Sequence, residues 1–141
     1  MNIKFRSVTE DDLPQFKAFL DEHNMLSDSD YERLRIFLHK NPLLSKMAYL
    51  DDKIVGGVLC SYDGLRGHLL KLVVEEEYRK QGIGKKLIAE VIMELEKLGC
   101  PEVTINCRPF LQNWYASQGF EKLDYMFYIK YLNSDHKDQS C

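Results

Sequence analysis

Residues 69–84, with the sequence LLKLVVEEEYRKQGIG, constrain the fold more than any other stretch of the chain. Their first six residues are rich in Leu and Val and predict a strand, and a long amphipathic helical pattern begins directly after the glycines. The first-turn amides of a helix have no intrahelical acceptors, and the helix dipole places partial positive charge there. Gly82 and Gly84 carry no side chains, so a phosphate could approach these amides closely. The stretch therefore predicts an anion site at the start of a helix.

Two common phosphate-binding motifs do not fit this site. The dinucleotide fingerprint requires a third glycine where Leu87 stands. The mononucleotide loop requires Ser or Thr after a Gly-Lys pair, but Gly84 and Lys85 are followed by Lys86. A nucleotide-binding protein is therefore the least favoured function, and it predicts stabilisation by ATP or NAD.

Composition limits the class of protein. A chain of 141 residues that is 45% hydrophobic and 29% charged suits one domain with a sizeable core. The net charge is −3 and no basic stripe follows a predicted helix face, so nucleic acid is not an expected partner. No apolar run is long enough for a signal peptide or a membrane span, so we expect a cytoplasmic protein with no membrane association.

The cysteines and histidines predict neither a metal site nor a disulfide framework. The four cysteines form no C-x-x-C pair, and the four histidines show no metal-ligand or triad spacing. In a cytoplasmic chain we expect reduced thiols, with Cys60 buried in an apolar run and Cys141 exposed at the terminus.

The hydrophobic periodicity predicts alternating strands and helices along the chain. The segments before residue 74 join through short turns and favour an antiparallel sheet, in which Gly56 and Gly57 mark a bulge or a close backbone approach. The expected strands are 2–7, 47–50, 54–62, 69–74, 103–106, 120–123 and 125–132; the expected helices are 13–20, opened by Thr9 as cap, 30–40, 83–98 and 111–118.

The helix after Gly82 has a continuous apolar face and ends at Gly99, because Pro101 prevents its continuation. A strand, a helix and a further strand in this order imply that the strand at 103–106 lies parallel to the strand at 69–74. The apolar face comprises Ile83, Leu87, Ile88, Val91, Ile92, Leu95 and Leu98.

Two motifs give the chain a family resemblance. Arg79-x-x-Gly82-x-Gly84 resembles the acetyl-CoA signature of the GNAT acetyltransferase superfamily, and Tyr115-x-x-x-Gly119-Phe120 resembles the Tyr-x-x-x-Gly-Phe motif of the same family. The order of elements from Ile3 to Leu132 is also that of the GNAT fold. The resemblance implies an α/β (α+β) fold with one acetyltransferase domain over residues 1–132 and a polar tail over 133–141. Its mostly antiparallel mixed sheet would have six to seven strands, splayed at the acetyl-CoA site and flanked by about four helices.

The resemblance also assigns the cosubstrate site. Backbone groups of the strand end would bind the pantetheine arm, and one amide there would polarise the acetyl carbonyl. The following turn would hold the pyrophosphate through backbone N–H groups, with added charge from its basic side chains. The implied acetyl-CoA-binding residues are Leu72, Val73, Val74, Arg79, Lys80, Gln81, Gly82, Ile83, Gly84 and Lys85.

Tyr115 matches the general-acid position of the family. A phenol has a reference pKa of about 10, so it is protonated at neutral pH and can donate a proton to a departing thiolate. The sequence departs from the family pattern at Arg108, where many relatives carry an Asn that contacts the cofactor. Whether Asn106 or Asn113 replaces that contact stays open, as does the choice between Glu75 and water as general base.

The leading hypothesis is an N-acetyltransferase that moves acetyl from acetyl-CoA to a primary amine of a small molecule or peptide in one ternary complex. The alternative is a non-catalytic acyl-CoA sensor or scaffold of the same fold. Release of free thiol from acetyl-CoA in the presence of an amine discriminates between them. The sequence leaves open the identity of the amine and whether the chain forms a homodimer.

Overall fold

A computed structural model describes residues 2–23, 25 and 30–132. The chain divides into two compact units, Met1–Ile105 and Asn106–Cys141. The predicted C-terminal tail, residue 24 and residues 26–29 lie outside the described residues, as does Cys141. Among the helices described, none is both long and apolar enough to cross a bilayer.

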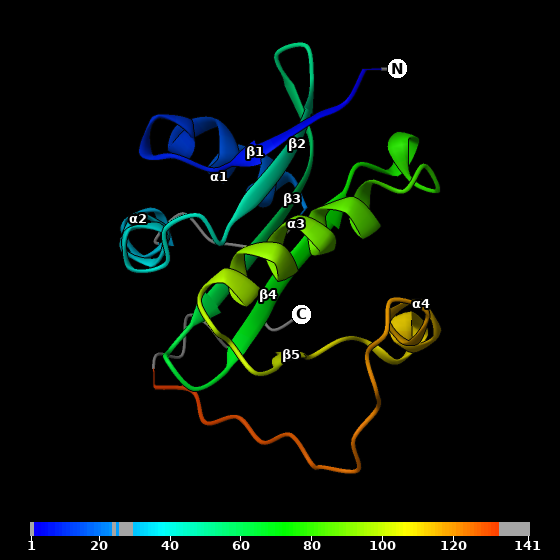
Figure 1. Cartoon of the computed structure of the whole chain (residues 1–141). Coiled ribbons are helices and arrows are strands. Elements are labelled where there is room, and N and C mark those ends of the chain that lie inside the picture. Colours follow the sequence, from blue (N-terminus) through cyan, green and yellow to red (C-terminus); the bar gives the residue numbers. More distant parts are fainter. Residues whose placement is uncertain (1, 24, 26–29, 133–141) are drawn as a thin grey trace. The chain divides into compact units, whose positions relative to one another are not determined.

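The first unit contains a five-stranded sheet whose strands follow chain order in space (Figure 1). The first four strands pair antiparallel, and the last two pair parallel, as predicted. The parallel pair is joined by a crossover helix, which is the connection that parallel strands require. The strands are β1 (Lys4–Ser7), β2 (Lys46–Leu50), β3 (Lys53–Tyr62), β4 (Gly67–Val74) and β5 (Val103–Ile105).

Helices α1 and α3 of the first unit lie on opposite faces of this sheet. Helices α1 (Leu13–Glu22) and α2 (Tyr31–Lys40) precede the strand hairpins, and α3 (Ile83–Lys97) connects β4 to β5. Adjacent strand residues face opposite sides. A Cβ atom at Gly57 would lie 2.7 Å from the Phe16 ring of α1, whereas one at Gly56 would lie 3.1 Å from Ile83 of α3. The two glycines thus mark the close approach predicted from the sequence, and neither face has room for a side chain there.

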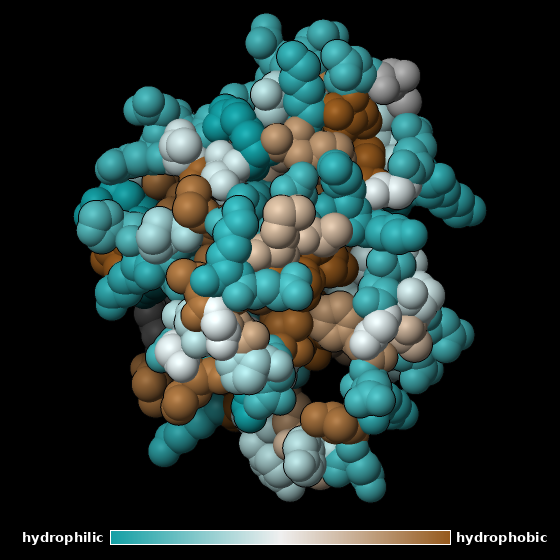
Figure 2. Space-filling view, in the orientation of Figure 1, coloured by the Kyte–Doolittle hydropathy of each residue, from teal (hydrophilic) through white to brown (hydrophobic). Residues whose placement is uncertain are grey.

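The helix α1 side holds one apolar cluster. Figure 2 shows hydrophilic side chains over much of one face, with apolar side chains visible between them. Burial of the apolar side chains in this cluster is the main source of folding free energy, about 25 cal/mol for each Å² of apolar surface. The cluster comprises Val8, Leu13, Phe16, Phe19, Leu20, Leu34, Met47, Ile54, Leu59 and Val73.

Helix α3 buries most of its predicted apolar face. Ile83, Leu87, Ile88, Val91 and Leu95 are buried, and Ile92 is half-buried. Leu98 is 54% exposed, so its assignment to this face was wrong. The reason is that α3 ends at Lys97, and Leu98 serves as the cap residue before Gly99 turns the chain at φ 75°.

The 3₁₀ turn that leads into α1 is closed by its own side chains. A 3₁₀ turn η1 (Glu10–Asp12) precedes α1, and the backbone N–H of Thr9 donates to the Asp12 carboxylate at 2.8 Å. Arg6 donates to both oxygens of the same carboxylate. The Arg6 hydrogen bond, aided by those from Thr9, lowers the pKa of Asp12 to about 2. This carboxylate therefore completes a capping box at the start of the turn that leads into α1.

The second unit contains a 3₁₀ turn η4 (Pro109–Leu111) and α4 (Gln112–Ser117). Residues 120–132 form no strand, so the predicted closing strands at 120–123 and 125–132 were wrong, and the described sheet has five strands rather than six or seven. Alternating apolar residues identify which side chains would share a face, but a strand also needs a partner for its backbone groups. The ribbon accordingly follows 120–132 as an extended chain without arrows (Figure 1).

Candidate functional site

Strand β4 leaves its parallel neighbour before it ends. Pairing between β4 and β5 covers Gly67–Leu69 and Val103–Ile105 only. Farther along β4, Leu72, Val73 and Val74 keep their antiparallel pairing with β3, opposite Val58, Gly57 and Gly56. Among the described residues, the end of β4 therefore takes its ladder partner from the β3 side alone, and the splay expected at this position stays a prediction.

The chain after β4 turns twice through the left-handed region. A 3₁₀ turn η3 (Glu76–Tyr78) follows the strand, the extended Arg79 precedes Lys80 at φ 64°, and Gly82 adopts φ 81°. Turns that contain left-handed residues can direct backbone amides toward a bound anion. Arg79 fixes the turn against the strand, because its Nε donates to the Val74 carbonyl at 2.9 Å. The side chains of Arg79, Lys80 and Lys85 are exposed at this turn.

The first turn of α3 is uncapped. Gly82 is the N-cap, no side chain accepts a hydrogen bond there, and no acidic residue lies in the first turn. The first helical hydrogen bond runs from the Lys86 N–H to the Gly82 carbonyl at 3.0 Å, so the preceding amides have no intrahelical acceptor. A Cβ atom at Gly82 would meet nothing within 4 Å, which leaves room for a ligand. Ile83 itself is buried, so only its backbone could contribute to such a site.

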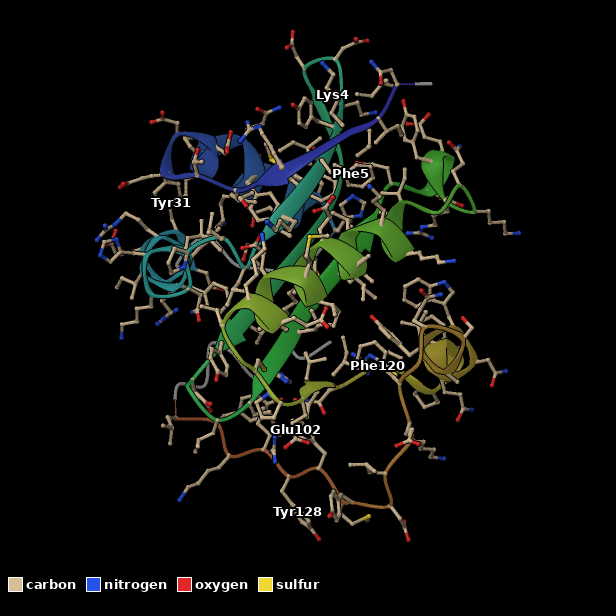
Figure 3. All side chains as sticks on the ribbon, viewed as in Figure 1. Lys4, Phe5, Tyr31, Glu102, Phe120 and Tyr128 are labelled. Atoms are coloured by element: carbon tan, nitrogen blue, oxygen red, sulfur yellow. The ribbon has the colours of Figure 1, made fainter. Side chains whose placement is uncertain are left out.

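One side of this helix start is shielded by β1. The Lys86 ammonium lies 5.6 Å from the centre of the Phe5 ring, and Phe5 is labelled near α3 in Figure 3. Lys86 also approaches Glu90 of its own helix at 3.7 Å. Positive charge is thus held beside the uncapped amides without an acidic side chain at the first turn.

Glu75 links the end of β4 to α1. Its Oε1 lies 3.2 Å from His23 Nε2, and its backbone N–H donates to the Val55 carbonyl at 2.9 Å. Its other polar neighbours are Glu22 at the end of α1, Lys53 of β3 and Glu77 of η3, which pairs with Lys53 at 3.2 Å. The pairing of His23 with Glu75 had no signal in the sequence, since 52 residues separate them and only the fold brings them together.

The acidic residues after β4 line an open surface hollow. Glu75, Glu76 and Glu77 border this hollow of about 490 Å³, which is largely open to solvent. Glu22, His23 and Glu75 also present donor atoms within 4.8 Å of one another, a spacing that a metal ion could bridge. His23 and Glu75, the two half-buried residues of this group, already pair with each other without a metal ion. The expectation that the protein binds no metal stays a prediction.

Tyr115 is held by the way α4 ends. The N–H of Phe120 donates to the Tyr115 carbonyl at 3.1 Å, and the N–H of Gly119 donates to the Ala116 carbonyl at 3.1 Å. These two bonds, with Gly119 at φ 91°, make a Schellman cap, and the Phe120 ring packs edge-on against Tyr115 at 5.7 Å. The Gly-Phe of the motif thus has a structural cause: both residues close the helix and fix the buried Tyr115.

Asn106, Asn113 and Cys60 gain no assigned role at the candidate site. Asn106 and Asn113 are both exposed, and whether either contacts the cofactor stays open. Cys60 is buried, and this burial raises the pKa of its thiol to about 12, which keeps it protonated and non-nucleophilic. The turn and β4 belong to the first unit, and Tyr115 belongs to the second.

A mixed sheet whose fourth strand runs through a glycine-bearing turn into an uncapped helix defines the class of protein: an acyltransferase fold that uses acetyl-CoA. The acetyltransferase (GNAT) family matches residues 5–120, and the chain belongs to this family. Both the enzyme class and acetyl-CoA as cosubstrate, predicted from the sequence, are thereby confirmed.

Relatives of known sequence are acetyltransferases. The chain is 31% identical over 108 residues to N-alpha-acetyltransferase 30 of Schizosaccharomyces pombe, covering 70% of this chain and 71% of the relative. It is 36% identical over 88 residues to an acetyltransferase of Yersinia pestis, covering 62% of this chain and 61% of that protein. The match therefore spans less than two thirds of the Yersinia protein.

Solved structures share the fold. An aminoglycoside acetyltransferase from an uncultured soil metagenomic sample, in complex with sisomicin, is 27% identical with a TM-score of 0.72, covering 92% of this chain and 96% of that one. AAC(6')-Iy in complex with a bisubstrate analogue is 21% identical with a TM-score of 0.78, covering 93% and 99%. At that lower identity the likeness concerns the fold alone.

Proposed function

We propose that the chain transfers acetyl from acetyl-CoA to a primary amine of a small molecule or peptide, within one ternary complex. Residues 1–132 are the acetyltransferase domain in this proposal, and 133–141 are a tail. The observation that carries it is the uncapped start of α3, where amides, a left-handed Gly82 and exposed basic side chains surround space for an anion.

The residues present suit the coenzyme A diphosphate. The turn from Arg79 to Lys85 holds the pyrophosphate through the first-turn amides, with Gln81 and Gly84 among its backbone contacts. Leu72, Val73 and Val74 bind the pantetheine arm along the edge of β4 that faces away from β3, beyond the end of its pairing with β5 at Leu69. When bound, acetyl-CoA supplies an acetyl group activated as a thioester.

Two side chains move the protons of the transfer. Glu75 accepts the proton that leaves the attacking amine, and His23 holds this carboxylate in place. A nitrogen–carbon bond forms while the carbon–sulfur bond breaks. Tyr115 donates its phenolic proton to the departing thiolate, and no cysteine is acylated.

The acceptor is a cationic amine that reaches the site from the acidic side. Glu75, Glu76 and Glu77 line the hollow at the end of β4, where carboxylates attract positive charge. The relatives named above suggest two acceptor groups, a peptide α-amine and an aminoglycoside amine. We expect turnover with one of these groups.

The proposal is tested by measuring free thiol released from acetyl-CoA with a panel of peptides, aminoglycosides, polyamines and amino acids. Amine-dependent release supports the transfer. Stabilisation by coenzyme A with no release for any amine would favour an acyl-CoA sensor instead. Stabilisation by ATP or NAD, with none by coenzyme A, would contradict the cosubstrate assignment for this site.

The role of Glu75 can be tested against a matched control at the next residue, Glu76. Glu75→Gln keeps the size of the side chain but removes the base, so we expect kcat to fall about 100-fold. Glu76→Gln removes the same charge from an exposed neighbour and should leave kcat within a few-fold. Equal effects of the two substitutions would assign both residues to general electrostatic attraction and leave water as the base.

A further inference from the structure

The last residues of β4 alternate in the direction of their backbone groups. The N–H of Glu75 donates to the Val55 carbonyl of β3 at 2.9 Å, and Val74 pairs in register with Gly56. In an antiparallel ladder, a residue whose backbone bonds the partner strand lies next to one whose N–H and C=O point to the other side. The N–H and C=O of Val74 therefore point away from β3, toward the edge along which β5 pairs only as far as Leu69.

The Val74 carbonyl has a partner on that edge. Arg79 Nε donates to it at 2.9 Å, from a side chain that is otherwise exposed to solvent. The peptide group between Val74 and Glu75 is thereby held at both ends, its N–H by Val55 and its C=O by Arg79. All of these residues belong to the first unit, so the arrangement is complete within that unit.

Two groups that the proposed transfer uses flank this peptide. The Glu75 side chain leaves from its nitrogen end and places Oε1 3.2 Å from His23 Nε2. The N–H of Val74 precedes it in the strand and points to the same edge as the carbonyl that Arg79 binds. A rotation of the peptide plane would displace the carboxylate and the amide together. A displacement of about 1 Å between reacting groups can cost about 100-fold in rate.

The bond to Val74 depends on where the donor stands in the side chain, and charge is not required for it. Nε is the fourth atom of the Arg79 side chain, counted from Cβ. A glutamine carries its amide nitrogen at this same position without the charge. A lysine carries a methylene there and keeps the charge one atom farther out. The two residue types therefore separate the donor of Arg79 from its charge.

We propose that Arg79 is a positioning residue: through Nε it holds the peptide between Val74 and Glu75, and so directs the Val74 amide toward the thioester carbonyl and the Glu75 carboxylate toward the amine. The effect on catalysis rests on the proposed function, whereas the hold on the peptide does not. The charge of Arg79 adds to cosubstrate binding as one exposed charge among several at this turn.

Steady-state thiol release from acetyl-CoA tests the two substitutions against each other. Arg79→Lys keeps the charge and loses the donor, so we expect kcat to fall about tenfold with the KM for acetyl-CoA nearly unchanged. Arg79→Gln keeps the donor and loses the charge, so kcat should stay within about twofold while KM rises about threefold. Full kcat in Arg79→Lys, or an equal loss of kcat in both variants, would overturn the proposal.

Arg66→Lys is the matched control for the change of residue type. Arg66 is also exposed, but it lies in the turn before β4, where its guanidinium bonds Glu102 at 3.4 Å. Its kcat and KM should equal those of the parent, and thermal unfolding checks that all variants fold alike. A loss of kcat in Arg66→Lys as large as that in Arg79→Lys would overturn the proposal, because the position of Arg79 would then have no special role.

Hydrogen exchange of the Glu75 amide in the free chain tests the hold on the peptide without turnover. Exchange requires opening of the bond from this amide to Val55. Without the Arg79 bond, exchange in Arg79→Lys should be about tenfold faster, the factor for roughly one hydrogen bond, and in Arg79→Gln it should stay near the parent rate. Unchanged exchange in Arg79→Lys would overturn the hold.

The kinetic and exchange measurements fail separately. A parent chain that releases no thiol with any amine contradicts the proposed function, and the exchange rates then still decide whether Arg79 holds the peptide. Faster exchange in Arg79→Lys with an unchanged kcat would confirm the hold and overturn its effect on catalysis.

Discussion

Gly82 and Gly119 share one backbone conformation and have opposite effects on the helices beside them. Their φ angles are 81° and 91°, and a Cβ atom at either position would meet nothing within 4 Å. Gly82 stands before α3 and leaves the first-turn amides without a capping side chain. Gly119 stands after α4 and returns the chain, so that two amides satisfy the last carbonyls.

The difference between these two helix ends indicates where backbone amides could bind a ligand. The end of α4 is satisfied internally, which makes Tyr115 a rigid side chain. No side chain caps the start of α3, whereas the 3₁₀ turn that leads into α1 is closed by the Asp12 carboxylate, which accepts from Thr9 and Arg6. The start of α3 combines the missing cap with a left-handed Gly82 and with no acidic residue in its first turn, and this combination is more informative than the glycine alone.

The largest effect is expected from Gly82→Asp, which puts a carboxylate where the diphosphate binds. Repulsion and bulk should weaken coenzyme A binding at least about 100-fold, measured by calorimetry or by thermal stabilisation. Gly64→Asp is the matched control, because Gly64 has φ 96° and nothing within 4 Å of its Cβ position but lies in the turn between β3 and β4. Normal affinity in Gly82→Asp would remove the turn from the site.

Tyr115→Phe tests whether the phenol held at the end of α4 acts as the proton donor. The ring contacts with Trp114 and Phe120 survive, whereas the proton donor is lost. We expect kcat to fall about 100-fold with the KM for acetyl-CoA nearly unchanged, measured by steady-state thiol release. An equal loss in both kinetic constants would reassign Tyr115 to binding.

Gly119→Ala asks whether the cap positions Tyr115. A Cβ at positive φ costs about 1–2 kcal/mol, and the strained cap should loosen the ring and lower kcat about tenfold. Gly99→Ala introduces the same strain at the end of α3, where φ is 75°. Its stability should fall similarly in thermal unfolding while kcat stays close to that of the parent; a drop in kcat for both variants would point to general destabilisation.

Asp12→Asn gives the smallest effect, at the capped turn that leads into α1. The folded pKa of about 2 lies below the unfolded value near 3.8, so the stabilisation is complete above pH 4 and is lost as the pH falls through 2. Since Arg6 is partly exposed, we expect the substitution to lower the free energy of unfolding by about 1 kcal/mol at pH 6. Urea unfolding at pH 6 and pH 2 measures this, and an equal loss at both pH values would contradict the role of the charge.

Local patterns predicted most of the first unit. The four antiparallel strands, the crossover helix and the parallel strand followed from apolar spacing and turn residues, because each pattern is decided by near neighbours in sequence. The motif residues of the turn and of α4 were also identified in advance. The predictions of a buried Leu98 and of two closing strands were wrong. An apolar residue or segment indicates a preference for burial or for extended structure, but it does not specify the partner that it packs or pairs with.

The sequence by itself determined the strand, turn and helix around Gly82, because backbone geometry and unpaired amides there depend on residues adjacent in the chain. Only the tertiary structure brought His23 to Glu75 across 52 residues, ended the β4–β5 ladder at Leu69, and left 123–132 without a ladder. Each of these depends on which distant segments meet, and contacts between distant segments are set by packing of the whole core, not by local propensity.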